Sequence, residues 1–207
     1  MTGLSVSRLV LTSDNDPMDG LECGGDRGGA MSLALRAGVL FSVIAGTLAA
    51  CSPTLDWRQA RPEGSGVTML FPCRPAHVER SVRVGSDTLV MHLHSCSAGG
   101  ATFSLAVADA GQADRVAPLL TALRELAVVN IGGIVSAAAS APSARTTPDA
   151  RAGRVRIDGR LPDGRVVVEH AAFFSRGVTL LQATILAIDR PVTAETVGTF
   201  FDAVRTQ

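Results

Sequence analysis

Apolar and polar residues alternate along much of the chain between residues 67 and 109, which is the period of a half-buried β-strand. A second strand-forming region begins near residue 154, and turn-forming Gly, Pro and Ser residues divide both regions into short strands. The predicted strands are Val67–Phe71, His77–Val84, Thr88–Ser95, Ala101–Asp109, Ile134–Ala138, Arg154–Asp158, Arg165–Phe174 and Val178–Leu186, preceded by a brief extended segment at Trp57.

Two other segments carry apolar residues at helical spacing. The stripe of the first is Ala117, Leu120, Leu123, Leu126 and Ala127, flanked by Val116 and Leu119. This helix is expected to end at Asn130, Gly132 and Gly133. Thr193 caps the second helix, whose buried stripe is Val197, Phe200, Phe201 and Val204. Residues 139–150 are rich in Ala, Ser, Pro and Thr and are predicted to form a mobile loop.

The order of these elements predicts the fold class. Neighbouring strands joined by tight turns must run antiparallel, which excludes a doubly wound parallel sheet. An apolar sheet face also needs helices to cover it. We therefore expect an α+β sandwich, in which an antiparallel sheet of two meanders is covered by two helices.

The first hairpin carries the most suggestive chemistry. Hydrophobic alternation selects the register in which Val84 faces Asp87, because a slip of one residue would mix the two faces. In that register His77 faces His94 and Glu79 faces His92, within cross-strand reach. Imidazole and carboxylate groups are ligands for Zn²⁺ and Cu²⁺. A metal or small-ligand site is one interpretation, and a solvated sheet face that tolerates histidines is the other.

The amino-acid composition limits which catalytic groups and partners are available. All 19 basic residues are Arg, and the chain contains neither Lys nor Tyr, so these groups are excluded as catalysts. Residues 51–207 carry 16 Arg and 14 acidic residues, a balance of 16 − 14 = +2 that argues against nucleic acid as a partner. On the strand Arg165–Phe174, we expect Glu169 to be exposed and His170 to be a half-buried packing residue. With no hydrolase or phosphate-binding motif present, we expect no enzymatic activity and no cofactor.

The N-terminal region carries a targeting signal. The residues Leu48-Ala49-Ala50-Cys51 close an apolar run, Val39–Ala50, that follows Arg36. This segment resembles the lipobox of bacterial lipoproteins, which implies cleavage before Cys51 and a diacylglyceryl group on its thiol. Ser52, the residue after this cysteine, resembles the one at the same place in lipoproteins sorted to the outer membrane. The chain would then be lipid-anchored in that membrane and face the periplasm. A retained membrane anchor and ordinary secretion are the alternatives.

These signals divide the chain into four parts. Residues 1–30 are rich in Gly and Asp and are expected to be disordered, with translation starting at Met31. Residues 31–50 would then be the signal peptide and residues 51–56 a tether to the bilayer. Residues 57–207 are expected to form one domain, since a mature chain of 207 − 50 = 157 residues is large enough for a core.

Two cysteines, Cys73 and Cys96, lie in this domain. An even pair in an exported chain predicts a disulfide. Two buried free thiols, which behave as small hydrophobic residues, are the alternative.

The residues around Trp57 and Phe71-Pro72-Cys73-Arg74-Pro75 carry a second resemblance. Together with the order of later elements, they resemble the opening of small PsbP-like domains. That family implies a PsbP-like sandwich that serves as a binding and assembly module, here with an envelope protein as partner, and it offers no catalytic residue to match. Cys73 stands where family members commonly carry Gly, and this departure favours a bridge to Cys96.

Overall fold

The computed structural model of the protein describes residues 54–140 and 152–206. The predicted disordered segment 1–30, the signal peptide 31–50 and the lipidation site Cys51 lie outside the described residues, as does most of the loop predicted at 139–150. The described residues belong to a single compact unit.

Seven strands form the main sheet, in the order β3-β4-β5-β9-β8-β7-β6, and every neighbouring pair is antiparallel. Their bounds are β3 Ala76–Val84, β4 Asp87–Ala98, β5 Ala101–Asp109, β6 Ile134–Ser140, β7 Gly153–Arg160, β8 Val166–Arg176 and β9 Thr179–Ile188. The α+β class with an antiparallel sheet is therefore confirmed.

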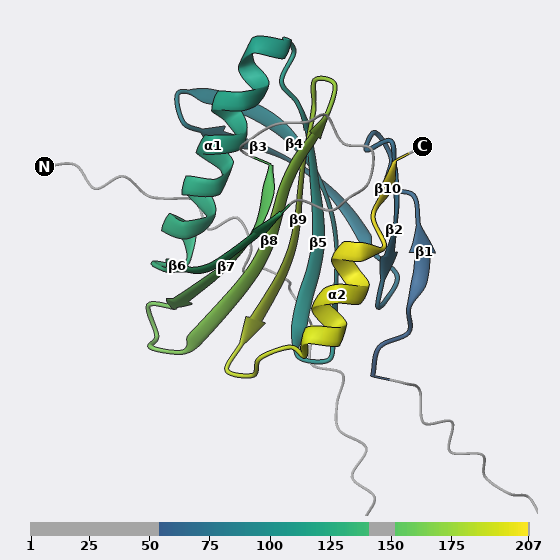
Figure 1. The fold of residues 1–207 in the computed structure, drawn as a ribbon, viewed down its shortest axis with the longest axis vertical. Helices are drawn as coiled ribbons and strands as arrows, with labels where there is room; N and C mark the ends of the chain where they lie inside the picture. The colour runs from purple at the N-terminus through teal and green to yellow at the C-terminus, as the bar shows by residue number, and fades with distance from the viewer. Residues whose placement is uncertain (1–53, 141–151, 207) are drawn as a thin grey trace, which may run out of the picture. The chain divides into compact units, whose positions relative to one another are not determined.

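Three shorter strands form a second sheet, in the order β1-β2-β10. Their bounds are β1 Arg58–Ala60, β2 Val67–Phe71 and β10 Arg205–Thr206. The two helices are α1 Ala113–Asn130 and α2 Ala194–Asp202. In Figure 1, α2 lies beside the small sheet, whereas α1 lies over the main sheet with its C-terminal end near β6. No helix in the described part of the chain is long and apolar enough to cross a membrane.

One face of the main sheet packs against α2 and the small sheet. Residues opposite each other on antiparallel strands share a face, so Phe103 of β5 and Ile185 of β9 lie on this side. Both are fully buried in one cluster with Met69 and Phe71 of β2 and with Phe200 of α2. Three aromatic rings meet edge to face at its centre, where Phe200 contacts Phe71 and Phe103 at centroid distances of 5.6 and 5.3 Å.

The other face of the sheet packs against α1, which contacts β3, β8 and β9. The buried residues of this helix are Val116, Leu119, Leu120, Leu123 and Ala127. The stripe is thus rotated from the predicted one, because Val116 and Leu119 belong to it and Leu126 is only half-buried. The predicted Thr193 cap on α2 is confirmed, since its side chain accepts a hydrogen bond from the Thr196 backbone N–H.

The end of α1 is fitted closely to β7. Gly159 has no side chain, and a Cβ there would lie 2.4 Å from the backbone oxygen of Ile131. The Arg160 backbone N–H donates to that same oxygen at 3.1 Å. Glycine is therefore required for the backbone of β7 to approach the turn after the helix.

Candidate functional site

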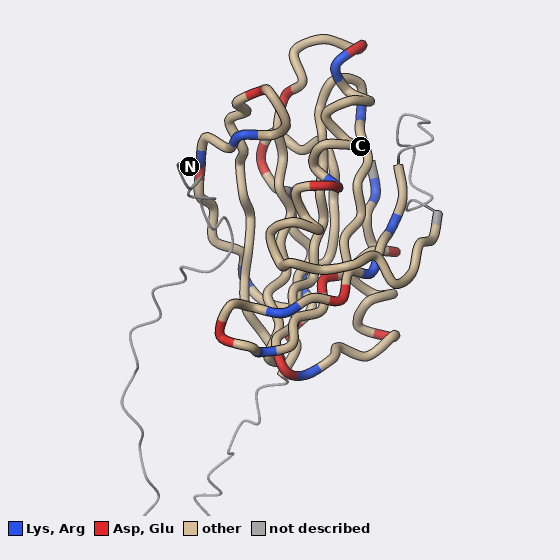
Figure 2. The backbone as a smooth tube through the Cα atoms, turned by 90° about the vertical axis from the view of Figure 1, so that its left-hand side faces the viewer, with Lys and Arg blue, Asp and Glu red and all other residues tan. Residues whose placement is uncertain are grey.

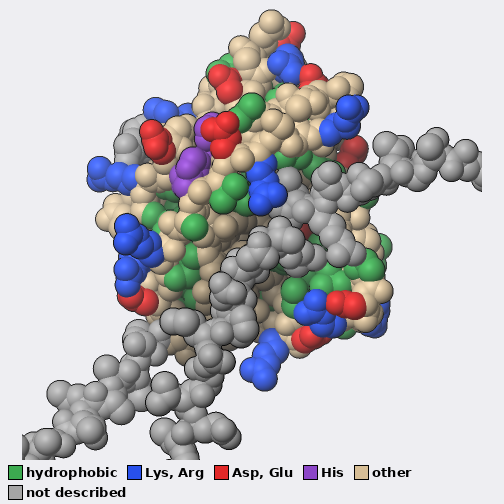
Figure 3. Space-filling model, turned by 180° about the vertical axis from the view of Figure 1, so that it is seen from behind, with side chains coloured by type: hydrophobic (Ala, Val, Ile, Leu, Met, Phe, Trp, Pro, Cys, Tyr) green, Lys and Arg blue, Asp and Glu red, His purple; other side chains and the backbone are tan. Residues whose placement is uncertain are grey.

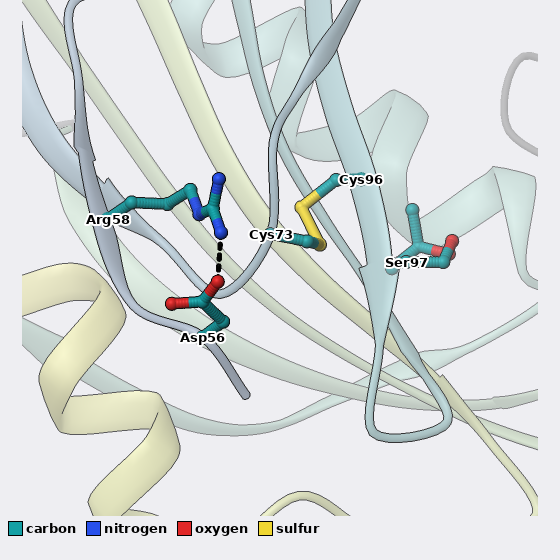
Figure 4. Close-up of a disulfide and its surroundings, with 6 residues drawn as sticks. Asp56, Arg58, Cys73, Cys96 and Ser97 are labelled. Atoms are coloured by element: carbon teal, nitrogen blue, oxygen red, sulfur yellow. Dashed lines mark hydrogen bonds and ion pairs between the residues drawn. A yellow bond between two sulfur atoms is a disulfide. The ribbon is translucent and has the colours of Figure 1, made fainter. Parts of the chain in front are cut away.

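A disulfide lies at one end of the predicted site. Cys73 follows β2 and Cys96 lies on β4, and their Cα atoms are 6.0 Å apart with the sulfurs bonded. Figure 4 shows this bond beside the ion pair of Arg58 and Asp56. The bond joins the small sheet to the main sheet through residues that are 23 apart in sequence. It therefore fixes the segment carrying β2 against β4.

The histidines lie on the same strand as Cys96. The predicted register is confirmed, because His77 faces His94 and Glu79 faces His92. The ring of His77 stacks on His94 with a centroid distance of 4.6 Å and an angle of 24° between planes. It also stacks on His92, at 5.6 Å and 10°. We call His77, Glu79, His92 and His94 the histidine face.

His94 differs from the other members because it is buried, with 7% of its surface exposed. Its Nε2 atom has no hydrogen-bond partner among the described residues. Burial lowers the pKa of His94 below its ordinary value, the His77 ring lowers it further, and a backbone hydrogen bond with Glu63 opposes the change. His94 is thus held in its neutral form, in which one ring nitrogen is free to accept a hydrogen bond or a ligand.

The outer part of the histidine face is open to solvent. The Nδ1 atom of His92 lies 3.7 Å from Oε2 of Glu79; the Glu79 side chain is exposed and that of His92 is half-buried. In Figure 3, histidine side chains gather at one place on the surface beside acidic side chains. A ligand from solvent would meet His77 and Glu79 first, because both are exposed.

The stacked rings do not converge on a point. Within residues 54–140 and 152–206, no group of three or more His, Cys, Asp or Glu side chains is arranged so that it would hold a metal ion. A metal at the histidine face would therefore require rotation of the imidazole rings about their side-chain bonds. The strand register places the three histidines on one face, but the side-chain conformations favour ring stacking.

Glu169 corrects a prediction from the sequence. It was expected to be exposed, yet only 5% of its surface is accessible. It lies on the α1 side of the sheet, between Ile157 of β7 and Leu186 of β9. Burial raises its pKa from 4.5 to about 7. The sequence carried a signal for this burial. The run from Val166 to Phe174 is mainly apolar and contains Glu169, and such a run is typical of a strand buried on both faces.

His170, the next residue, is half-buried as predicted. It lies on the opposite face from Glu169, directly across from Arg156 of β7. Burial lowers the pKa of His170, and the positive charge of Arg156 adds to the effect. Arg156 is itself paired with Asp158, whose Oδ1 atom accepts from its Nε at 2.9 Å.

No family model matches the sequence, and no curated protein is detectably similar to it.

Proposed function

We propose that this chain is a lipid-anchored lipoprotein of a bacterial cell envelope, and that its folded domain is a non-enzymatic binding or assembly module facing the periplasm. The observation that carries the proposal is the Cys73–Cys96 disulfide, because such bonds persist in oxidising compartments outside the cytosol. The lipobox at Leu48–Cys51 points to the same compartment independently.

The finer parts of the proposal rest on the sequence. Ser52 favours the outer membrane, with Cys51 as the attachment to the bilayer. We further propose that the domain is a PsbP-like sandwich with two meanders and that its partner is an envelope protein. The Phe71-Pro72-Cys73-Arg74-Pro75 motif supports this assignment.

Intact mass of protein extracted from membranes tests the proposal. We expect a chain that begins at Cys51, carries acyl groups and lacks two hydrogens because of the disulfide. An unmodified mass that retains residues before Cys51 would refute the lipid anchor. As a matched control, Cys51→Ser should remain unacylated and should be recovered as the uncleaved precursor.

A second candidate function, binding of a metal or small ligand, is favoured by one observation. The buried Nε2 of His94 has no hydrogen-bond partner among the described residues, and the His94 ring stacks on the ring of His77. Titration of the native protein with Zn²⁺ or Cu²⁺ tests it, with His92→Ala as the variant and His170→Ala, on a distant strand, as the control. Equal binding by the two variants would exclude the histidine face as the site.

A further inference from the structure

The first described residues of the chain are held against one end of the main sheet. The side chains of Leu55 and Thr54 lie beside Gly99 in the turn between β4 and β5, where a Cβ on the glycine would be 3.1 and 3.6 Å from them. The Asp56 backbone N–H donates to the Pro72 backbone oxygen at 2.9 Å. These contacts fix the point at which the chain enters the domain.

The connection from this point to the proposed lipid anchor is short. Thr54 follows Cys51 by 54 − 51 = 3 residues. An extended chain spans at most about 3.6 Å per residue, so the Cα atoms of these two residues lie within about 11 Å of each other. A diacylglyceryl group on Cys51 would hold this residue at the level of the lipid headgroups. The turn between β4 and β5 would then lie close to the surface of the bilayer.

Strand pairing shows which other connections lie at the same end of the sheet. A row of directly paired residues crosses five strands, from β4 to β7, through Ala98, Ala101, Ala187, Val168 and Asp158. The β4–β5 turn (99–100), the β9–α2 loop (189–193) and the β7–β8 turn (161–165) all lie beyond this row. Figure 1 shows the three connections at the lower end of the domain. We call the end that they form the anchor end.

The charges of the anchor end suit a layer of zwitterionic headgroups. Its two longer connections hold Arg165 and Arg190 with Asp163 and Asp189, a net charge of 2 − 2 = 0, and all four residues are exposed. In Figure 2, basic and acidic positions lie side by side in the loops at the lower end. Phosphate and ammonium groups of the lipids would each meet a group of opposite charge there, so contact with the bilayer needs no anionic lipid.

The opposite end of the sheet lies far from the anchor end. β4 runs for 12 residues between the two ends. At about 3.4 Å per residue its length is about 40 Å. The β3–β4 turn (85–86) and the β8–β9 turn (177–178) lie at this opposite end. On β4, His92 precedes Ala98 by 98 − 92 = 6 residues, so the histidine face lies about 20 Å from the anchor end.

We infer that the domain stands directly on the bilayer, with the anchor end against the lipid headgroups and the β3–β4 and β8–β9 turns facing away from the membrane. This inference rests on the proposed lipid anchor and adds the surface that faces the membrane. The short connection to Cys51 imposes this orientation, and it leaves the histidine face open to the periplasm.

Fluorescence quenching on the acylated protein in vesicles tests the inference. In the chain processed at Cys51, that thiol is acylated and the other two cysteines are bonded to each other, so an introduced cysteine is the only free thiol. Arg190→Cys and Pro162→Cys place a bimane label at the anchor end, and Ser86→Cys places it at the opposite end as the matched control. All three positions are exposed. In phosphatidylcholine vesicles that contain a lipid with a nitroxide on its headgroup, we expect at least twofold stronger quenching of both anchor-end labels than of the control.

A longer tether provides the second measurement. Insertion of about 20 Gly and Ser residues between Ser52 and Pro53 gives the linker a root-mean-square reach of about 25 Å. We expect the quenching of the Arg190→Cys label to fall toward that of the Ser86→Cys label, because the domain can then turn away from the membrane. Equal quenching at the two ends without the insertion, or quenching that the insertion leaves unchanged, would overturn the inference. Equal quenching of a protein whose intact mass includes acyl groups would refute the orientation alone, whereas a mass without acyl groups would refute the anchor itself.

Discussion

His77 and His94 stack across the first hairpin with ring centroids 4.6 Å apart, although they belong to different strands. His94 is the buried partner and His77 is exposed. Protonation of both rings would place two positive charges in contact, beside His92 as a third imidazole. Glu79 and the backbone and carboxylate of Glu63 are the acceptors near the cluster.

This contact predicts that the contribution of His94 to stability is lost in acid. The folded-state pKa of His94 lies below the ordinary value of 6.5, so the unfolded chain binds more protons as the pH falls through 6.5. The contribution of neutral His94 to stability is complete above that pH and is lost below it. We expect the free energy of unfolding, measured with urea, to fall less between pH 8 and pH 5 for His94→Gln than for the wild type. The pKa of His170 is also lowered, so the variant His170→Gln measures how much of the pH dependence comes from His170. A loss of equal size in the wild type and in both variants would contradict this account.

Glu169 predicts the opposite dependence on pH. Its pKa is about 7 in the folded state against an ordinary value of 4.5, so the folded protein retains a proton that the unfolded chain loses between these values. The free energy of unfolding therefore falls as pH rises through this window, by about 3 kcal/mol at most at 1.36 kcal/mol per pKa unit. Glu169→Gln should match the wild type at pH 4 and exceed its stability at pH 8.

A matched control for this substitution is Glu125→Gln, on the exposed side of α1. Exposed substitutions of this kind change stability by less than about 0.5 kcal/mol. Chemical denaturation at the two pH values measures all three proteins. If Glu169→Gln gains no stability at pH 8, burial does not raise the pKa of this carboxyl and the prediction is wrong.

The disulfide predicts a loss of stability on reduction. It closes a loop between residues 23 apart, for which the chain-entropy relation gives about 3 kcal/mol. The double variant Cys73→Ser/Cys96→Ser should unfold at a lower urea concentration than the oxidised wild type. Reductant should move the wild type toward the variant and should leave the variant itself unchanged. A reductant effect of equal size on both would assign the stabilisation to another part of the chain.

Two glycines predict changes of opposite sign. A Cβ at Gly198, within α2, would meet only the Asp202 carboxylate at 3.6 Å, so Gly198→Ala should stabilise the helix by about 0.5–1 kcal/mol. A Cβ at Gly159 would lie 2.4 Å from the Ile131 backbone oxygen, so Gly159→Ala should destabilise the protein. Thermal unfolding followed by circular dichroism measures both. Equal shifts in the two variants would show that contact with Ile131 is unimportant.

Local sequence patterns were sufficient to predict the strands and helices and the register of the first hairpin. The alternation in residues 77–95 predicted the strand register, because a slip of one residue would expose Val82 and Leu89, which are buried. The same pattern could not predict the side-chain conformations of the histidines. These conformations depend on the stacking of three rings and on the segment near Glu63.

By itself, the amino-acid sequence determined the α+β class, the register of the first hairpin and the cap of α2, since each depends on residues close together in the chain. Only the tertiary structure decided that Glu169 is buried, that α1 contacts the sheet through Val116 and Leu119, and that β6 is an edge. The physical reason is that burial on a sheet depends on which strands and helices cover each face. That covering is made by residues far apart in sequence, and no local period encodes it.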